Sequence, residues 1–322
     1  KNLMTALKSS QQLFVLNDNL PEYCESAKRL SFGGFHSYVK LSEGCSRKCA
    51  FCAIPDIRGI LRSRKKKSIF EEIRSLEQKA YKEFNLVAED SSLFGREIYR
   101  DYSLRNLIKD LSFEMPESLF RLMYVFPDKT VYSTIDAIDE ADNFIKYIDT
   151  PFQHVSKRML KSMGRFMQED PRKAAEYAIK KSILLRSSVM VGFPGEKEKD
   201  FDELLRFVEN GYVSKLGVFI YSDEKNTPAY KLKDKVSRNV KIERFNEIIK
   251  AYRKVTAKKM RMNIGNVKKA VFTSRTNGMY IGRLIEDAPS VDSVLISERT
   301  YVKLNELTDV KILDIKNYTY IA

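Results

Sequence analysis

The sequence predicts an α/β fold in two parts: a partial, TIM-like open (β/α)6 barrel and, after it, a small all-β barrel. Two observations support this prediction. From residue 38 to about residue 262, short apolar runs alternate with amphipathic stretches, a pattern typical of parallel strands joined by crossover helices. After Gly265 the pattern changes to short strands separated by turn residues. Because six strand–helix units are fewer than the eight of a closed barrel, we expect the first barrel to remain open.

The elements of the first part follow from this periodicity. Strands are expected at 38–41, 84–88, 119–125, 146–149, 183–191 and 215–221. Helices are expected between them, including 68–81, 104–113, 155–163 and 201–208. Ser68 and Glu71 match a capping box, which predicts that the first of these helices begins at Ser68. A longer apolar stripe predicts one long helix over 240–262.

The second part is expected to consist of strands at 269–274, 279–284, 291–296 and 310–315. Asn277-Gly278 indicates a hairpin, because a two-residue turn needs positive φ at these positions. The domain organisation predicted from these patterns is a linker or remnant of a missing N-terminal domain at 1–36, an α/β domain at 37–262 and a β-barrel domain at 263–322.

Composition and charge narrow the class of protein. The chain has 322 residues, no apolar run long enough to span a bilayer and no secretory pattern at its start, so we expect a cytoplasmic protein. The net charge of +14 suits acidic or nucleic-acid partners. Residues 262–322 contain eight Lys/Arg and seven Asp/Glu, a net charge of +1, so the remaining +13 lies in residues 1–261. The second part is therefore not built as a basic surface for phosphates.

Three of the four cysteines, Cys45, Cys49 and Cys52, stand within eight residues. Such clustering predicts a metal site rather than disulfides. With three and two residues between them, the thiolates can surround a [4Fe–4S] cluster and leave one iron without a protein ligand. A structural zinc site is the alternative, but it usually needs four ligands, and neither Cys24 nor His36 stands at a familiar spacing. Cys24 is interpreted as a free thiol.

The cysteine spacing, with Phe51 just before the third cysteine, resembles the signature of the radical S-adenosylmethionine (SAM) superfamily. Several further segments resemble the methylthiotransferases of that superfamily, and the last of them resembles the branch called RimO: 44–64, 149–154, 185–188, 191–196 and 282–292. The resemblance extends from residue 38 to nearly the end of the chain. Residues 263–322 look like a TRAM domain, an OB-like small barrel.

The resemblance implies SAM bound at the open iron of the cluster. The residues that it implies for cofactor binding are Phe51, Ile54, Gln153, Arg186, Gly192, Phe193, Pro194, Gly195 and Glu196. Arg186 suits the methionyl carboxylate of SAM, and equally a salt bridge to an acid of the barrel rim. His154 is interpreted as structural support, and Glu89 stands where the family usually has glutamine. No protein side chain is assigned as catalytic, because the cofactor carries the radical chemistry.

The activity implied is transfer of a methylthio group to the β-carbon of an aspartate in small-subunit ribosomal protein twelve, after hydrogen abstraction by a 5′-deoxyadenosyl radical. A flavodoxin or ferredoxin is the implied electron donor. Glu286, Asp287 and Asp292 suit docking of this basic protein substrate. A tRNA methylthiotransferase similar to MiaB is the alternative, favoured by the basic first part. A non-catalytic, metal-stabilised ribosome-binding adaptor is the second alternative.

Two segments leave alternatives open. Methylthiotransferases have an N-terminal domain with a second, auxiliary [4Fe–4S] cluster, so we expect either that this domain was removed or that the protein is a diverged member without it. The basic run 62–67 is interpreted as a solvated helix approach or as a docking patch for an acidic redox donor or for rRNA.

Overall fold

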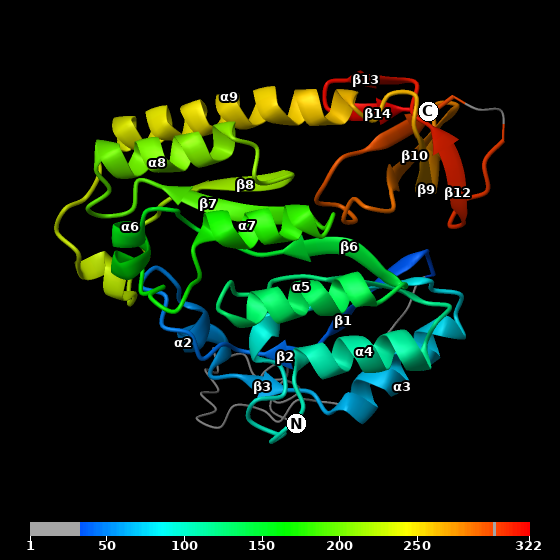
Figure 1. Ribbon diagram of the computed structural model, residues 1–322, viewed down its shortest axis with the longest axis horizontal. Helices are drawn as coiled ribbons and strands as arrows, with labels where there is room; N and C mark the ends of the chain where they lie inside the picture. Colours follow the sequence, from blue (N-terminus) through cyan, green and yellow to red (C-terminus); the bar gives the residue numbers. More distant parts are fainter. Residues whose placement is uncertain (1–32, 299–300) are drawn as a thin grey trace, which may run out of the picture.

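The structure, a computed structural model, describes residues 33–298 and 301–322. Residues 1–32 of the predicted linker, and Cys24 with them, lie outside the described residues. Two six-stranded sheets organise the described part, one formed before residue 221 and the other after residue 266. The predicted fold class, an open α/β barrel followed by a small β structure, is confirmed (Figure 1).

The first sheet is a parallel sheet whose strand order follows the chain. Its strands are β1 (His36–Lys40), β4 (Glu83–Val87), β5 (Leu119–Leu122), β6 (Phe144–Asp149), β7 (Leu184–Val191) and β8 (Lys215–Ile220). In the described residues, β1 and β8 are the two edges and do not pair with each other, so the barrel is open. A short two-stranded sheet of β2 (Ser42–Glu43) and β3 (Arg62–Ser63) flanks the first crossover.

Helices cover the outer face of the parallel sheet. Besides the short helices α2 (Ile54–Arg58) and α6 (Lys157–Ser162) and the 3-10 turns η1 (Ser91–Leu93) and η2 (Pro228–Lys231), which lie outside this layer, the helices are α3 (Lys66–Glu77), α4 (Leu104–Glu114), α5 (Thr130–Glu140), α7 (Pro171–Lys180), α8 (Glu198–Glu209) and α9 (Arg238–Arg261). Their apolar stripes and the outward-facing strand residues form one large core, which includes Val39, Leu86, Leu122 and Ile148. Figure 1 shows α9 running along the molecule from the barrel to the second sheet.

The start of α3 differs from the prediction. The helix begins at Lys66, with Lys65 in the N-cap position; the Lys65 side chain makes no capping hydrogen bond, and the Tyr99 hydroxyl accepts one from the Lys66 amide at 2.8 Å. The Ser68 hydroxyl accepts a hydrogen bond from the guanidinium of Arg64 at 2.8 Å. The predicted capping box is therefore wrong, because a neighbouring arginine engages the hydroxyl that the cap needs.

The second sheet is mixed, in the order β12 (Leu307–Lys311), β9 (Val267–Thr276), β10 (Met279–Leu284), β11 (Leu295–Ser297), β14 (Thr319–Ile321) and β13 (Asp314–Lys316). The hairpin at Asn277-Gly278 is confirmed, with φ of 50° and 81°. The strand predicted at 310–315 is two strands, β12 and β13, and the strand predicted at 291–296 begins only at Leu295. This sheet has a core of its own around Phe272, Tyr280 and Leu284.

The loop 285–292, between β10 and β11, packs against the inner face of the parallel sheet. The guanidinium of Arg121, on β5, donates hydrogen bonds to three backbone carbonyls of the loop. The Tyr38 hydroxyl, on β1, donates to the carbonyl of Pro289 at 3.1 Å, and Lys215, on β8, pairs with Asp287. The loop thus connects both edge strands of the open barrel.

In the part of the chain that the structure describes, we find no helix with the length and hydrophobicity that a bilayer crossing requires.

Candidate functional site

The cysteine loop lies at the carboxyl end of β1, where parallel barrels carry their sites. Gly44, at φ 75°, lets the backbone approach the opposite side of the loop, because a Cβ there would lie 2.3 Å from the carbonyl oxygen of Ile60. The Cys45 amide donates to the carbonyl of Gly59 at 3.1 Å and closes the loop. The three cysteines line one pocket together with Phe51 and Ile54, with Arg165 from the loop after α6, and with residues that follow the later strands: Glu89, Asp90, Tyr124, Phe126, Pro151 and Gln153.

Each thiol sulfur has one hydrogen-bond donor. The amide of Arg47 donates to Cys45 Sγ and the amide of Ile54 to Cys52 Sγ, both at 3.4 Å, and the Arg165 guanidinium donates to Cys49 Sγ at 3.5 Å. Burial raises the pKa of Cys45 to about 11 and also raises the pKa of Cys52. Metal binding at these thiols must therefore release protons, and the three donors stabilise the thiolates that result.

The donor set fits a [4Fe–4S] cluster better than zinc. A zinc ion would hold its sulfur ligands about 2.3 Å from one point. Within residues 33–298 and 301–322, no three His, Cys, Asp or Glu side chains are arranged to hold a single metal ion. Glu89 Oε2 is buried in the same pocket without a partner, so the pocket retains a free carboxylate oxygen for a bound group. Three thiols plus an unsatisfied acceptor suit a cluster that also binds a polar cofactor.

Two arginines that the sequence analysis did not single out contact the pocket. The guanidinium carbons of Arg47 and Arg165 lie 3.9 and 4.2 Å from the centre of the Phe126 ring. Arg47 also donates to Asp90 at 2.8 Å and to Asp128 at 2.6 Å. Arg47 stands inside the cysteine motif and could have been noticed there, whereas Arg165 is brought to Cys49 only by the fold.

Gln153 lies in the pocket, in a strained backbone conformation. Its φ is 66°, in the left-handed region, and its amide and carbonyl bond to Ser188 and Met190 of β7 at 2.7 Å. These bonds fix the side chain beside the cysteines. By contrast, Arg186 does not line this pocket: it pairs with Asp149 at 2.8 Å and Asp292 at 3.7 Å inside the barrel. Of its two predicted roles, the salt bridge is the one that this geometry shows.

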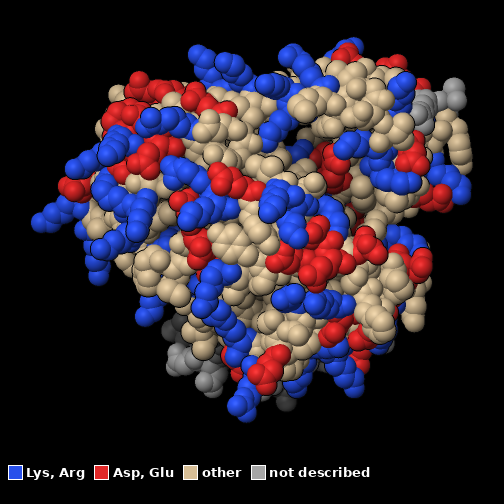
Figure 2. All heavy atoms as spheres, in the orientation of Figure 1, with Lys and Arg blue, Asp and Glu red and all other residues tan. Residues whose placement is uncertain are grey.

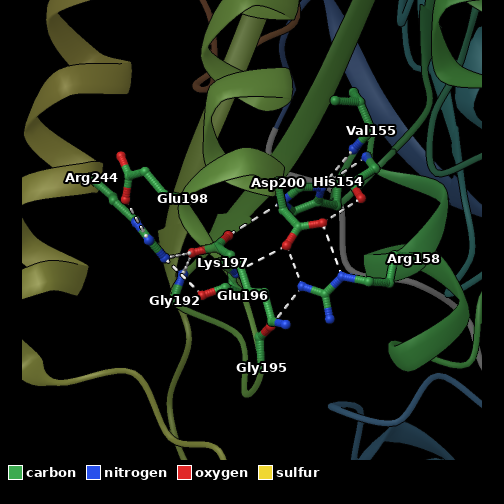
Figure 3. A network of polar contacts seen from close by, with 11 residues as sticks. His154, Val155, Arg158, Gly192, Gly195, Glu196, Lys197, Glu198, Asp200 and Arg244 are labelled. Atoms are coloured by element: carbon green, nitrogen blue, oxygen red, sulfur yellow. Dashed lines mark hydrogen bonds and ion pairs between the residues drawn. The ribbon is translucent and has the colours of Figure 1, made fainter.

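The turn after β7 is held by a buried network (Figure 3). The carboxylate of Glu196 accepts hydrogen bonds from the Gly192 amide and from Arg244, both at 2.7 Å, and lies 3.2 Å from His154 Nε2. Glu196 and His154 are 5% and 0% exposed, so neither can reach a ligand. Glu196, predicted to contact the cofactor, is instead turned into the protein, because Arg244 of α9 supplies its counter-charge. His154 is structural, as interpreted.

The remainder of this turn supports the pocket from behind. The Phe193 ring is fully buried, 6.5 Å from Phe51 and 5.2 Å from Tyr221 between centroids. Gly192, Phe193, Pro194 and Gly195 do not line the cysteine pocket. Their contact with it runs through Phe51, which packs on Phe193.

The predicted docking residues do not form one exposed surface. Asp287 is 1% exposed and pairs with Lys215, and burial raises its pKa to about 6 against the effect of this lysine. Asp292 accepts a hydrogen bond from the Tyr147 hydroxyl at 3.0 Å, with a side chain 3% exposed. Only Glu286, paired with Lys268 at 3.1 Å, is accessible. Asp287 and Asp292 fasten the loop to the barrel, so they are not free to bind a partner.

The basic run 62–67 is largely neutralised. Arg64 is buried and pairs with Glu72, and Lys66 pairs with Asp110 at 2.7 Å and with Glu114 at 3.2 Å. This geometry favours the interpretation of the run as the approach to α3 over a docking patch, although Arg64 is buried rather than solvated.

The chain is a radical SAM enzyme. Its parallel barrel is open, and Cys45, Cys49 and Cys52 lie together at the carboxyl ends of the strands. The model of the Radical SAM superfamily matches residues 39–208. Among solved structures, the radical SAM methyltransferase TsrM from Kitasatospora setae is similar in fold, with a TM-score of 0.52 and 14% identity over 69% of this chain and 52% of that one.

Comparison with curated proteins defines the family more narrowly. The chain is 37% identical over 310 residues to the ribosomal protein uS12 methylthiotransferase RimO of Acetivibrio thermocellus, covering 94% of this chain and 68% of that protein. It is 35% identical to RimO of Geobacter sulfurreducens, covering 97% and 71%. The chain therefore belongs to the RimO family of radical SAM methylthiotransferases, enzymes that use a [4Fe–4S] cluster and SAM. It spans about two thirds of the length of these relatives.

Proposed function

We propose that this chain carries the radical step of a methylthio transfer to the β-carbon of an aspartate in small-subunit ribosomal protein twelve. The observation that supports this most is the pocket in which Cys45, Cys49 and Cys52 meet, in a chain whose relatives are named for that substrate. When bound, a [4Fe–4S] cluster on these thiols supplies the electron that converts SAM into methionine and a 5′-deoxyadenosyl radical.

The side chains around the cluster site would set its charge and exclude water. Arg165 is buried and donates to Cys49 Sγ, so it offsets the negative charge of the thiolates. Phe51, packed on Phe193, and Gln153, fixed by β7, would hold the cofactor against the cysteine loop. The free Oε2 of Glu89 is suited to accept a hydrogen bond from a cationic group of the cofactor.

Further aspects of the proposal follow from the family. We propose domains at 37–262 and 263–322, supported by the separate cores of the two sheets. A flavodoxin or ferredoxin as electron donor, a cytoplasmic location, contact with rRNA, and an auxiliary [4Fe–4S] cluster in the full-length protein are parts of the same proposal. The tRNA and adaptor alternatives are not favoured, because the similar relatives are named as ribosomal protein methylthiotransferases.

The test is an assay for 5′-deoxyadenosine. The protein is loaded anaerobically with iron and sulfide, reduced with dithionite and mixed with SAM, and the product is measured by mass spectrometry. Wild type is compared with Cys49→Ala and with Cys24→Ala, a cysteine change outside the motif. We expect product from wild type and Cys24→Ala and none from Cys49→Ala. A fully loaded wild-type cluster that yields no 5′-deoxyadenosine refutes the proposal.

A further inference from the structure

One edge of the parallel sheet, that of β8, is open to solvent (Figure 1). Phe219 and Ile220 are neighbours on this strand, so their side chains point to opposite faces of the sheet. Both are nevertheless exposed, by 55% and 39%. The other edge strand, β1, contains no exposed residue. Exposure on both faces at once indicates that β8 has room beside it for a further strand.

The backbone groups along this edge are free. The Tyr221 amide donates to the Val191 carbonyl of β7 at 2.9 Å. Because the backbone groups of a strand alternate between its two sides, the amides and carbonyls of Leu216, Val218 and Ile220 face away from β7. No described residue outside the sheet bonds to them. They form a row of donors and acceptors at every second residue.

The sequence of β8 does not block this edge. Proteins usually protect a free strand edge with lysine, proline or a bulge, because an open edge pairs with other chains. From Gly217 to Ile220 the strand contains only Gly, Val, Phe and Ile, and its pairing with β7 has no bulge. An apolar, exposed and unprotected edge is suited to accept an added strand.

A groove lies where that strand would lie. It has a volume of about 520 Å³, and it is lined by residues 215–217 of β8, which alternate between the two faces of the sheet. Its opposite wall consists of residues 291–294 and 317–319, and α9 covers it. Thr256 of α9 lines the groove, is 8% exposed, and has a hydroxyl without a hydrogen-bond partner among the described residues. The groove therefore offers both the place and a free polar group for a peptide.

The free edge leads to the cysteine pocket. Phe219 stands beside Met190 of β7 in the register of the sheet. The Met190 amide donates to the carbonyl of Gln153, which lines the pocket, at 2.7 Å. Met190 also packs in the cluster that contains Phe51, a second residue of the pocket. A strand paired with β8 would therefore end beside the cofactor site.

We propose that β8 receives an extended segment of the protein substrate as an added strand, which brings the target aspartate to the cysteine pocket. This inference rests on the proposed function, since it concerns how that substrate is held. A peptide fits the edge because only a polypeptide backbone offers donors and acceptors at the spacing of a strand. Charge does not select the occupant: over the face shown in Figure 2, Lys and Arg side chains are interspersed with Asp and Glu.

The first test is an N-methyl scan of a short, labelled peptide centred on the target aspartate of small-subunit ribosomal protein twelve. The full chain is loaded with iron and sulfide, and binding is measured by fluorescence anisotropy without SAM or reductant. Only alternate residues of an added strand donate to β8, so N-methylation should weaken binding about tenfold at every second position and little at the positions between. Losses that do not alternate, or a parent peptide that does not bind, overturn the proposal.

Two substitutions at one residue test the edge from the side of the protein. Ile220→Pro removes the amide that faces the edge and keeps the bonds to β7, because proline is tolerated where the amide of an edge strand points to solvent. This variant should bind the parent peptide about tenfold more weakly than the matched control, Ile220→Ala, which keeps the amide. Equal affinities in two variants that unfold at the same temperature overturn the proposal. If Ile220→Pro does not fold, the peptide scan still decides.

Hydrogen exchange followed by mass spectrometry locates the contact. The peptide should slow exchange of the β8 amides and leave those of β1 unchanged, and the opposite pattern overturns the proposal. A dimer joined through β8 that excludes the peptide also overturns it. The 5′-deoxyadenosine assay is a separate result: a peptide that pairs with β8 in a protein without this product refutes only the radical step. Product from a protein whose β8 stays unprotected refutes only the inference about β8.

Discussion

Glu83 lies between two guanidinium groups inside the barrel, and its neutralisation tests how the two sheets are joined. The carboxylate of Glu83 is 3.4 Å from Arg121 and also pairs with Arg283, and the Glu83 and Arg121 side chains are fully buried. Arg283 belongs to β10, in the second sheet, so Glu83 connects the sheets by charge. Glu83→Gln keeps the shape of the side chain and removes only its charge.

The expected cost follows from burial. Breaking a buried ion pair by removing one partner costs about 3–5 kcal/mol, because the remaining charge stays desolvated without a counter-charge. Two guanidiniums lose their partner here, so the upper part of this range applies. If the free energy of unfolding falls by about 3 kcal/mol per molar urea, the urea concentration at the midpoint of unfolding should fall by about 1–2 M.

Urea unfolding followed by far-ultraviolet circular dichroism measures this change, since the chain contains no tryptophan. The matched control is Glu286→Gln, which removes the same charge at the same junction from a partly exposed pair with Lys268. That pair is worth less than about 1 kcal/mol. If Glu83→Gln unfolds at the same urea concentration as the control, burial of the Glu83 charge does not stabilise the fold, and the reasoning is wrong.

Three further predictions concern the site and its support. Gly44→Ala should lower the iron content after reconstitution, because its Cβ would lie 2.3 Å from a carbonyl oxygen. The control variant Gly33→Ala, at φ 80° with open space around the Cβ, should bind iron normally. Iron and sulfide analysis measures both variants, and equal iron contents would contradict the steric argument. Arg165→Met should lower the reduction potential of the loaded cluster, because a donor and a positive charge near Cys49 Sγ are lost, and a potential titration that finds no shift would disprove this role. Although burial raises it, hydrogen bonds from neighbours hold the pKa of Asp200 at about 2, so its stabilisation is present above about pH 4 and lost as pH falls through 2. Asp200→Asn should therefore flatten the loss of stability between about pH 4 and 2, as measured by unfolding midpoints across this range, and an unchanged slope would count against it.

The fold could be predicted because the outer faces of the strands are apolar and the crossover helices are amphipathic, and both patterns are local. The interior of the barrel could not be predicted in this way. Arg283 and Glu83 meet across 200 positions of the sequence, and no periodicity reports such a pair. The start of β11 was predicted wrongly, because the first residues of the predicted strand belong to the loop 285–292. That loop contacts the barrel instead of pairing in the second sheet.

The candidate site likewise has one part that the sequence predicts and one part that only the fold brings together. Cys45, Cys49 and Cys52 are neighbours in sequence, so their spacing alone indicates a cluster. Arg165 reaches Cys49 across 116 positions and was missed. Asp287 was interpreted as a docking residue because an acid suits a basic protein substrate, but the fold supplies Lys215 of β8 as its partner. Position in the fold, rather than residue type, decides the role of such an acid.

The loop 285–292 has a consequence for how the chain is made. A closed barrel completes its own wall, whereas this one depends on a segment that leaves the ribosome after every strand of the barrel has emerged. Until then Arg121 and Glu83 have no access to their partners in the later chain, and their charges keep water in the barrel interior. Docking of the loop is therefore the step that excludes this water, and it can occur only after all six strands of the barrel have been synthesised.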